Sequence, residues 1–379
     1  MKTLYLLFYG RFPSEKAASL FAAKSCEAFA DEGLKVVLLV PRRLFRDKQD
    51  PFSYYHIQQN FDVVFLPTID FLFLGFFQKF FFFLGYFFFS ISSSIYLLFK
   101  ADKNDIIYSN ESLPLFFATL FFNNTFYEMH DFPESKLSLF GFFLNRVRFA
   151  LVHNRWKISH LHEVFKMNPA KILHEPNAVD IRDFDIEITK KEARKKIQLP
   201  IDKKIAIYTG HLYGWKGVDT LAESAKLLPS EYLIVFVGGT DADVANFRKK
   251  YGNEPRILIA GNKKHQDIPV WQKAADLLVL PNTAKEKISK YYTSPMKLFE
   301  YMASRRPVVA TDIPSIREIA DDTTAIFVTP DDPQSLMKGI KEAIKNKQHA
   351  EKISENAYQY VLKHTWKERA KRIISFFSS

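Results

Sequence analysis

The sequence predicts an α/β protein with two doubly wound domains, each a parallel sheet covered by helices. A chain of 379 residues is too long for one compact core and suits two domains of ordinary size. Short apolar runs typical of strands alternate with longer segments typical of amphipathic helices, and this alternation predicts βαβ units. The alternation is interrupted by a polar, charged stretch near residues 180–203 and then resumes, which indicates a second domain.

The first domain is expected to span residues 1–178. An Ala-rich amphipathic helix is expected after the first strand, with Ser14 as its N-cap and Gly33 at its C-terminal end. The expected strands of this domain are residues 4–9, 35–40, 105–109, 125–130 and 150–154.

The second domain is expected to span residues 179–355, and residues 356–379 are expected to form a C-terminal helix that packs back on the first domain. Because open parallel sheets bind ligands at the carboxyl ends of their strands, functional residues are expected in the loops after them. The expected strands are residues 204–210, 233–239, 256–261, 276–282, 306–312 and 325–330.

Composition narrows the class of protein. The hydrophobic fraction of 47% and the charged fraction of 25% are those of a folded globular protein. Cys26 is the single cysteine, so an internal disulfide is excluded and a reducing compartment is favoured. The net charge of +11 indicates an anionic partner, either nucleic acid, an acidic membrane surface or a phosphorylated ligand. Scattered basic residues without recognition-helix or zinc-finger spacing argue against nucleic acid.

Residues 71–99 are unusually rich in phenylalanine, with 12 Phe in 29 positions. The stretch is long enough to span a bilayer. Gln78 with Lys79, and the serines at 92–94, divide it into shorter apolar segments, and both flanks belong to one βαβ order. Three interpretations stay open: buried helices, a hydrophobic surface that contacts a membrane, and a true span.

A glycine-rich segment follows the first strand of the second domain, in "YTGHLYGWKGVDTL". Gly210, Gly214 and Gly217 allow close backbone approach, and Lys216 lies beside the start of the next helix. Such a turn suits phosphate oxygens. The alternative is a plain turn with a surface lysine, since the spacing is neither that of a dinucleotide site nor that of a P-loop.

"GHLYGWKG" together with "YYTSPMKLFEYMASRRPVVATDIPSIRE" resembles the donor-binding domain of retaining GT-B glycosyltransferases of family 4. "RFPSEKAASLFAAKSCEAFADEGLKVVLLVP", "YEMHD" and "KILHEPNAVD" resemble the first domain and the hinge approach of the same enzymes. The resemblance implies the GT-B fold, two Rossmann-like domains facing across a cleft. It also implies transfer of a sugar from a nucleotide-diphosphate donor.

The resemblance implies a role for Glu300, whose carboxylate would accept hydrogen bonds from the ribose hydroxyls. Backbone N–H groups at the turn ahead of it would meet the diphosphate at a helix N-terminus. The alternative is a solvated glutamate on a surface helix. The full donor-binding set implied by the resemblance is Gly210, His211, Lys216, Gly217, Ser294, Pro295, Met296, Lys297, Leu298 and Glu300.

Two positions depart from the family pattern. Tyr292 stands where the family often has an acid that holds the transferred sugar, and a phenol cannot supply negative charge to an oxocarbenium-like transition state. His211 stands where the family has a phosphate-binding arginine, and it is charged only when protonated.

In the first domain, the resemblance places His130 near the sugar of the donor as a polar stabiliser. The catalytic set is therefore His130, Lys216 and Tyr292, although His130 with Asp131 is also a common structural pair. Arg11 and Lys16 lie in the loop after the first strand, where the family contacts acceptor and donor phosphate. "HNRWK", residues 153–157, closes a strand and has no assigned role.

No metal or other cofactor is expected. Asp241 and Asp243 form an Asp-x-Asp pair of the kind that holds a metal–nucleotide in the other major glycosyltransferase fold. They follow a strand and begin a helix, so capping of that helix is the preferred interpretation.

The sequence thus predicts a retaining, hexosyltransferase-type glycosyltransferase of polysaccharide biosynthesis. Its expected partners are a nucleotide-diphosphate sugar, a glycan or lipid-linked acceptor and an anionic membrane surface. It is expected to be cytoplasmic, peripheral at the inner face of the cytoplasmic membrane. The alternative is a noncatalytic nucleotide-sugar binding or assembly subunit of a glycan pathway, in which Tyr292 marks lost chemistry.

Overall fold

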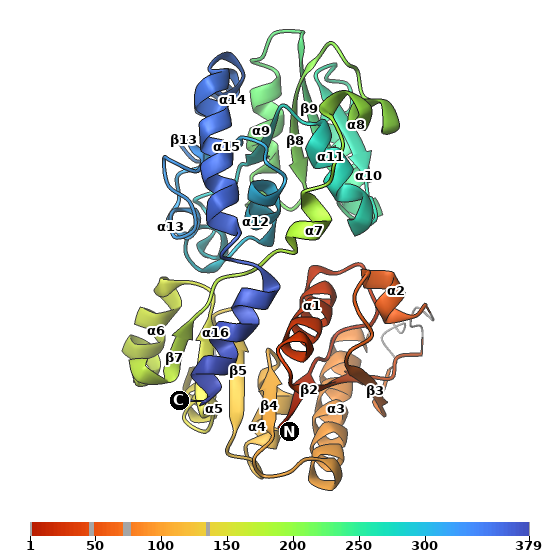
Figure 1. The fold of residues 1–379 in the computed structure, drawn as a ribbon, viewed down its shortest axis with the longest axis vertical. Helices are drawn as coiled ribbons and strands as arrows, with labels where there is room; N and C mark the ends of the chain where they lie inside the picture. Colours follow the sequence, from red (N-terminus) through yellow and green to blue (C-terminus); the bar gives the residue numbers. More distant parts are fainter. Residues whose placement is uncertain (1, 45–48, 71–76, 134–136, 379) are drawn as a thin grey trace. The chain divides into compact units, whose positions relative to one another are not determined.

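The computed structural model describes residues 2–44, 49–70, 77–133 and 137–378. The chain divides into two compact units, coloured along the sequence in Figure 1. Unit 1 comprises Met1–Glu175 with Trp366–Ser379, and unit 2 comprises Pro176–Thr365. The C-terminal segment differs from the expected single helix at 356–379, because helix α15 (Lys347–Val361) belongs to unit 2 and only α16 (Trp366–Ser378) belongs to unit 1.

Unit 1 contains a seven-stranded parallel sheet, which confirms the doubly wound prediction. Two short edge strands, β3 and β7, were absent from the expected set, since three to five residues carry little periodic signal. The spatial order is β3 (Asp62–Leu66), β2 (Lys35–Pro41), β1 (Thr3–Leu7), β4 (Ile106–Ser109), β5 (Thr125–Met129), β6 (Phe149–Val152) and β7 (Ile172–His174).

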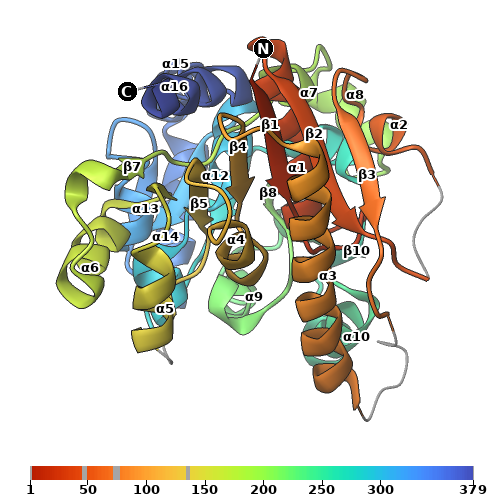
Figure 2. The same ribbon diagram turned by 90° about the horizontal axis from the view of Figure 1, so that it is seen from below.

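Helices cover both faces of this sheet. Helix α16 packs beside α1 on one face, where Phe377 meets Phe126 of β5. On the other face α3, α4 and α5 lie side by side (Figure 2) and bury Phe89, Leu115 and Phe143 in one core. The helices of unit 1 are α1 (Ala17–Asp31), α2 (Pro51–Tyr55), α3 (Gln78–Lys100), α4 (Ser112–Ala118), α5 (Leu137–Leu144), α6 (Arg155–Phe165) and α16.

Helix α3 contains most of the phenylalanine-rich stretch, of which residues 71–76 lie outside the described residues. By length and composition alone α3 could cross a membrane, with 23 residues and a mean hydropathy of 1.7 in its most apolar window. It is nevertheless the crossover from β3 to β4. Phe89 and Leu97 are fully buried against the sheet, and the Tyr5 hydroxyl donates to the Lys100 carbonyl at 2.9 Å.

Unit 2 contains a six-stranded parallel sheet in the order β10 (Ile257–Gly261), β9 (Tyr232–Val237), β8 (Lys204–Thr209), β11 (Leu277–Leu280), β12 (Val308–Thr311) and β13 (Ile326–Val328). Its helices are α7 (Ile181–Phe184), α8 (Lys190–Lys196), α9 (Val218–Ala225), α10 (Asp241–Tyr251), α11 (Ile268–Ala274), α12 (Met296–Ala303), α13 (Pro314–Arg317), α14 (Pro333–Lys345) and α15. At the start of α10, Thr240 and Asp243 form a capping box, which confirms the capping interpretation of that segment.

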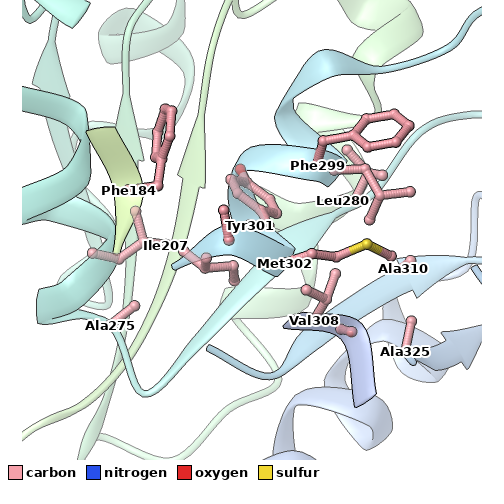
Figure 3. Packing of buried hydrophobic residues seen from close by; sticks show 14 of the residues in the cluster. Phe184, Ile207, Ala275, Leu280, Phe299, Tyr301, Met302, Val308, Ala310 and Ala325 are labelled. Carbon is pink, nitrogen blue, oxygen red and sulfur yellow. The ribbon is translucent and has the colours of Figure 1, made fainter. Parts of the chain in front are cut away.

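Helix α12 is anchored in the core of unit 2. Its residues Phe299, Tyr301 and Met302 are fully buried and pack among strand residues such as Leu280 and Ala310 (Figure 3). The Tyr301 hydroxyl also accepts a hydrogen bond from the Thr209 N–H of β8 at 2.8 Å. Helix α12 is therefore held rigidly against the carboxyl end of β8.

The packing of α3 predicts opposite outcomes for two neighbouring residues. Leu97→Ala removes a fully buried side chain and should lower the free energy of unfolding by about 2–5 kcal/mol. Phe99→Ala alters a side chain that is 83% exposed and should change it by less than about 0.5 kcal/mol. Urea denaturation in detergent-free buffer measures both, and equally small effects would show that α3 does not belong to the core of unit 1.

Candidate functional site

Two partly exposed glycines form a backbone edge where β8 and β9 end. Gly210 and Gly238 directly follow these strands and have positive φ values of 124° and 118°. A Cβ on Gly238 would lie 2.4 Å from the Gly210 carbonyl oxygen, so the two loops are too close for a side chain. The edge is at the carboxyl end of the sheet, where parallel sheets bind ligands.

Lys297, in the first turn of α12, extends to this edge. Its Nζ would lie 2.7 Å from a Cβ placed on Gly210, and it lies 4.0 Å from the centre of the Tyr208 ring. The Nζ atom is buried and makes no hydrogen bond. Burial, and then the charge of Lys216, hold the pKa of Lys297 well below its usual range.

Lys216 contributes a second amine from the turn Gly214–Lys216. The turn is fixed because Gly217, with φ 71°, packs on the loop after β11, where a Cβ would lie 1.8 Å from the Pro281 carbonyl oxygen. The Lys216 Nζ lies 3.6 Å from the centre of the Trp215 ring, and burial lowers its pKa to about 7. Among the described residues neither lysine amine has a carboxylate in direct contact, and Glu300 acts on Lys297 only at longer range, so the two desolvated amines favour a bound anion.

The loop before α12 is tied to the start of unit 2. The Asn177 side chain donates a short hydrogen bond to the Ser294 carbonyl, and the Asn177 N–H lies 3.5 Å from the Ser294 hydroxyl. Pro295 is the N-cap of α12 and supplies no side-chain acceptor to the first turn. The Leu298 N–H donates to the Pro295 carbonyl at 3.0 Å, and no side chain caps the N–H groups ahead of it, which therefore depend on solvent or a ligand for their hydrogen bonds.

Glu300 lies one turn further along α12. Its side chain is 14% exposed, and a carboxylate oxygen lies 3.6 Å from the His265 Nε2. The alternative of a freely solvated glutamate is therefore wrong. Besides His265, Lys297 acts on this carboxylate at longer range.

Other members of the expected donor set have different surroundings. The Leu298 side chain is fully buried in the core, so only its backbone is available to a ligand. His211 is exposed and stacks on Tyr213, with 4.8 Å between ring centres. Tyr292, in the π-helical turn Ile288–Tyr292, is 7% exposed. Met296 is partly buried and Pro295 is buried.

In unit 1, Arg11 and Lys16 are exposed in the loop between β1 and α1. The Tyr55 hydroxyl holds this loop, since it accepts from the Ser14 N–H at 2.7 Å and donates to the Ser14 carbonyl at 2.8 Å. The expected N-cap is wrong: Lys16 precedes the first helical residue, and the Ser14 hydroxyl instead accepts from the Lys16 N–H at 3.2 Å.

His130 directly follows β5, and its Nε2 lies 3.5 Å from Oε1 of the buried Glu128. His153 Nε2 lies 2.8 Å from the same oxygen. Among the described residues, this trio has spacing that would suit a metal ion. However, Arg369 Nη2 lies 2.6 Å from that oxygen, and its positive charge would repel a metal cation there.

Sequence reasoning missed four residues around His130, namely Glu128, His153, Lys157 and Arg369. An acid at an inward position of the β-strand in "YEMHD" signals a buried charge that requires a partner. The segment 153–157, which had no assigned role, supplies His153 and Lys157 to this cluster. Arg369 could not be found in this way because 241 residues separate it from Glu128.

Comparison with solved structures defines the class of fold. Sucrose-phosphate synthase of Thermosynechococcus elongatus matches over 100% of this chain and 98% of its own, with a TM-score of 0.78 and 18% identity. Anabaena HepE, solved in complex with UDP and glucose, matches over 100% of both chains, with a TM-score of 0.76 and 17% identity. The chain thus has the fold of the GT-B glycosyltransferases.

The family follows from the sequence of unit 2. Residues 189–360 match the family model described as glycosyl transferases group 1, and they span most of unit 2. Unit 2 therefore resembles the glycosyl transferases group 1 family over residues 189–360, the part of the chain that contains the two motifs at 210–217 and 291–318.

Curated relatives resemble part of the chain. The putative teichuronic acid biosynthesis glycosyltransferase TuaC of Bacillus subtilis is 29% identical over 154 residues, 41% of this chain and 36% of TuaC. Alpha-D-kanosaminyltransferase of Streptomyces kanamyceticus is 28% identical over 182 residues, 46% of this chain and 45% of that enzyme. The chain thus spans less than half the length of these two relatives.

The lowered lysine pKa values predict that affinity for a diphosphate such as UDP falls as pH rises above 7. Below pH 7 Lys216 already carries its proton, whereas above pH 7 a proton must be taken up on binding. One linked proton lowers affinity by up to about ten-fold per pH unit. Calorimetry with UDP from pH 7 to 9, in two buffers of different ionisation enthalpy, measures this. An affinity independent of pH, with equal heats in both buffers, would contradict the desolvation of Lys216.

Proposed function

We propose that the protein is a retaining glycosyltransferase that moves a sugar from a nucleotide-diphosphate donor to a glycan or lipid-linked acceptor. The observation that carries the proposal is the pair Lys216 and Lys297 at the glycine edge after β8. Two desolvated amines beside a glycine backbone without side chains suit the two phosphates of a nucleoside diphosphate. Glu300, one turn along α12 from Lys297, is then the acceptor for the ribose hydroxyls.

In this proposal the leaving diphosphate is stabilised by fixed charge. Negative charge grows on the β-phosphate as the bond to the anomeric carbon breaks, and Lys216 and Lys297 lie where they would oppose it. The first-turn N–H groups of α12 add the positive end of a helix dipole. These groups would stabilise the negative charge of the leaving diphosphate, as a metal ion does in other glycosyltransferases. No metal or other cofactor is therefore proposed.

Retention of configuration follows from attack on the same face of the sugar. The acceptor oxygen bonds to the anomeric carbon as the carbon–phosphate oxygen bond breaks, and the acceptor proton passes to the departing phosphate oxygen. This step balances without an enzyme nucleophile. His130 is proposed as a polar contact of the sugar, and Tyr292 as a phenol at the position of the family acid. A hexose is the proposed sugar class by family resemblance.

The first test of this proposal is UDP binding by calorimetry. Lys216→Ala should lose at least about 1.5 kcal/mol of binding free energy, because a charge-assisted contact is removed. Wild-type affinity should persist in EDTA. The matched control is Lys226→Ala, a 46% exposed lysine of unit 2 that is paired with Glu223. Full UDP affinity in Lys216→Ala, or its loss in EDTA, would count against the proposed site.

The second candidate, a noncatalytic nucleotide-sugar binding or assembly subunit, is favoured by Tyr292, since this position lacks the acid of the family pattern. The two candidates share UDP binding and differ in turnover. Slow release of glucose from UDP-glucose by the wild-type protein, abolished in Lys216→Ala, supports the enzyme. Binding without any turnover of a panel of UDP and GDP sugars supports the second candidate.

The proposed acceptor lies at an anionic membrane surface, and unit 1 has an apolar face that suits this partner. Ring contacts join its three helices, since Phe87 of α3 meets Phe117 of α4 and Phe116 of α4 meets Phe142 of α5. We call this the Phe face. Its exposed members are Phe80, Phe83, Phe87, Phe88, Ile95, Leu98, Phe99, Phe121, Leu139 and Phe142.

Basic residues flank the Phe face, which favours a lipid bilayer over an uncharged partner. Lys79 and Lys100 are exposed at the two ends of α3, and Arg146 and Arg148 are exposed after α5. Because α3 also fills the core under the sheet, interfacial insertion of its outer side preserves unit 1, whereas a span would remove the crossover between β3 and β4. Peripheral attachment at the cytoplasmic membrane face is therefore proposed.

Binding to the bilayer should be reversible and partly electrostatic. Vesicles with anionic lipid should bind the protein at low salt and release part of it at high salt, because only the charge attraction is screened. Phe83→Ser with Phe99→Ser should weaken binding without unfolding unit 1, since both residues are exposed. Retention through salt and alkaline carbonate would indicate a span, and absence of binding at any salt would favour a soluble acceptor.

A further inference from the structure

Glu128 of β5 is a fully buried carboxylate surrounded by hydrogen-bond donors from three other elements. The Tyr108 hydroxyl of β4 makes a short hydrogen bond to its Oε2. Arg369 of α16 donates to Oε1 at 2.6 Å, and His153, after β6, approaches the same oxygen at 2.8 Å. Neighbouring strands and the C-terminal helix therefore converge on one charge.

The charge states of this cluster follow from its contacts. Burial alone would raise the pKa of Glu128, but the Arg369 charge and the His130 and His153 contacts hold it well below its usual range. Burial lowers the pKa of His153 to about 3, so this imidazole is neutral, with its Nε2 2.8 Å from Glu128 Oε1. Glu128 and Arg369 thus form a pair of opposite charges, and the buried Lys157 ammonium lies beside them on the carbonyls of Met129 and His130.

His130 is held from two sides. Its Nε2 lies 3.5 Å from Glu128 Oε1, and its ring meets the edge of Phe21 with 4.8 Å between ring centres. The buried Lys157 ammonium donates to the carbonyl of His130 at 2.6 Å and to that of Met129 at 2.9 Å. The ring and the main chain are both constrained, while 28% of the side chain stays exposed.

We propose that Glu128 is a positioning residue for His130. The ionised carboxylate, 3.5 Å from Nε2, favours the tautomer of the His130 ring with its proton on that nitrogen and fixes the ring plane. Nδ1 is then the ring nitrogen that remains for a substrate. Arg369 acts one step further out, because its charge keeps Glu128 ionised. The role of His130 in sugar transfer rests on the proposed function, whereas the assignment of its tautomer does not depend on that function.

The arrangement fits this role better than a plain structural ion pair. A structural pair needs Arg369 and Glu128 alone, and α16 already has a second pair on unit 1, Arg372 with Glu175 at 2.6 Å. Here both imidazoles converge on the oxygen that Arg369 also binds. The hydrogen bond from Lys157 to the His130 carbonyl also has no part in packing α16 on the sheet.

The test compares two charge-neutral double variants. Glu128→Gln alone would leave the Arg369 charge buried without its partner and risks unfolding. Glu128→Gln with Arg369→Met removes both charges together. The matched control is Glu175→Gln with Arg372→Met, which removes the neighbouring ion pair of the same helix and does not touch His130. Circular dichroism melting establishes that each variant is folded.

The readout is the tautomer of His130 in long-range ¹H–¹⁵N spectra of histidine-labelled protein, assigned with His130→Gln. Wild type should show the Nε2 proton and an unprotonated Nδ1 at pH 8. The Glu128 double variant should shift His130 toward a mixture of tautomers, and the control should keep the wild-type pattern. Turnover of UDP-glucose should fall at least about ten-fold in the Glu128 double variant, with UDP affinity unchanged.

A proton on Nδ1 in the wild-type protein would overturn the inference, and this measurement does not depend on any variant folding. An unchanged His130 tautomer in the folded Glu128 double variant, or an equal change in the control, would also overturn it. Failure of the wild-type protein to bind UDP would instead overturn the proposed function, and the tautomer result would stand apart from it.

Discussion

Parallel pairing is the constraint on which the rest of the structure depends. Strands that pair in parallel all end at one edge of their sheet, so the segments that follow them are brought together whatever their separation in the chain. In unit 2 this puts Gly210 and Gly238 in contact. In unit 1 it puts His130 beside His153, 4.7 Å apart between ring centres. Each candidate site is a direct result of this geometry.

The buried cations of unit 2 differ in whether the fold gives them a carboxylate partner. Arg194 is buried but bonds Asp276 at 2.7 Å, and the buried Lys273 lies 3.2 Å from Asp185. These cations are satisfied by the fold. Lys297 has no such acceptor, and its neighbour Lys216 adds repulsion. A protein retains an unfavourable contact of this kind where a ligand offsets it, which is why the lysine pair identifies the site more clearly than the glycines.

Helix α3 illustrates how one composition serves two environments. Phe89 is fully buried and Phe99 is 83% exposed, although both belong to the same phenylalanine-rich run. The buried side of α3 packs on the sheet of unit 1. The outer side, together with α4 and α5, forms the Phe face. The mean hydropathy of a segment does not depend on which side of the helix its apolar residues occupy. It therefore could not distinguish a helix packed on the sheet from a membrane-spanning helix.

The sequence by itself determined the fold class, the central strands of both sheets and the motifs around Lys216 and Glu300, because these signals are local and periodic. It also identified the capping role of Asp243. Its errors fell on short edge strands and on the N-cap of α1, where packing outweighs local pattern. Only the tertiary structure decided that Lys297 lies against Gly210 and that Arg369 reaches Glu128 across 241 residues. Such contacts follow from strand order and helix docking, which no local stretch of sequence encodes.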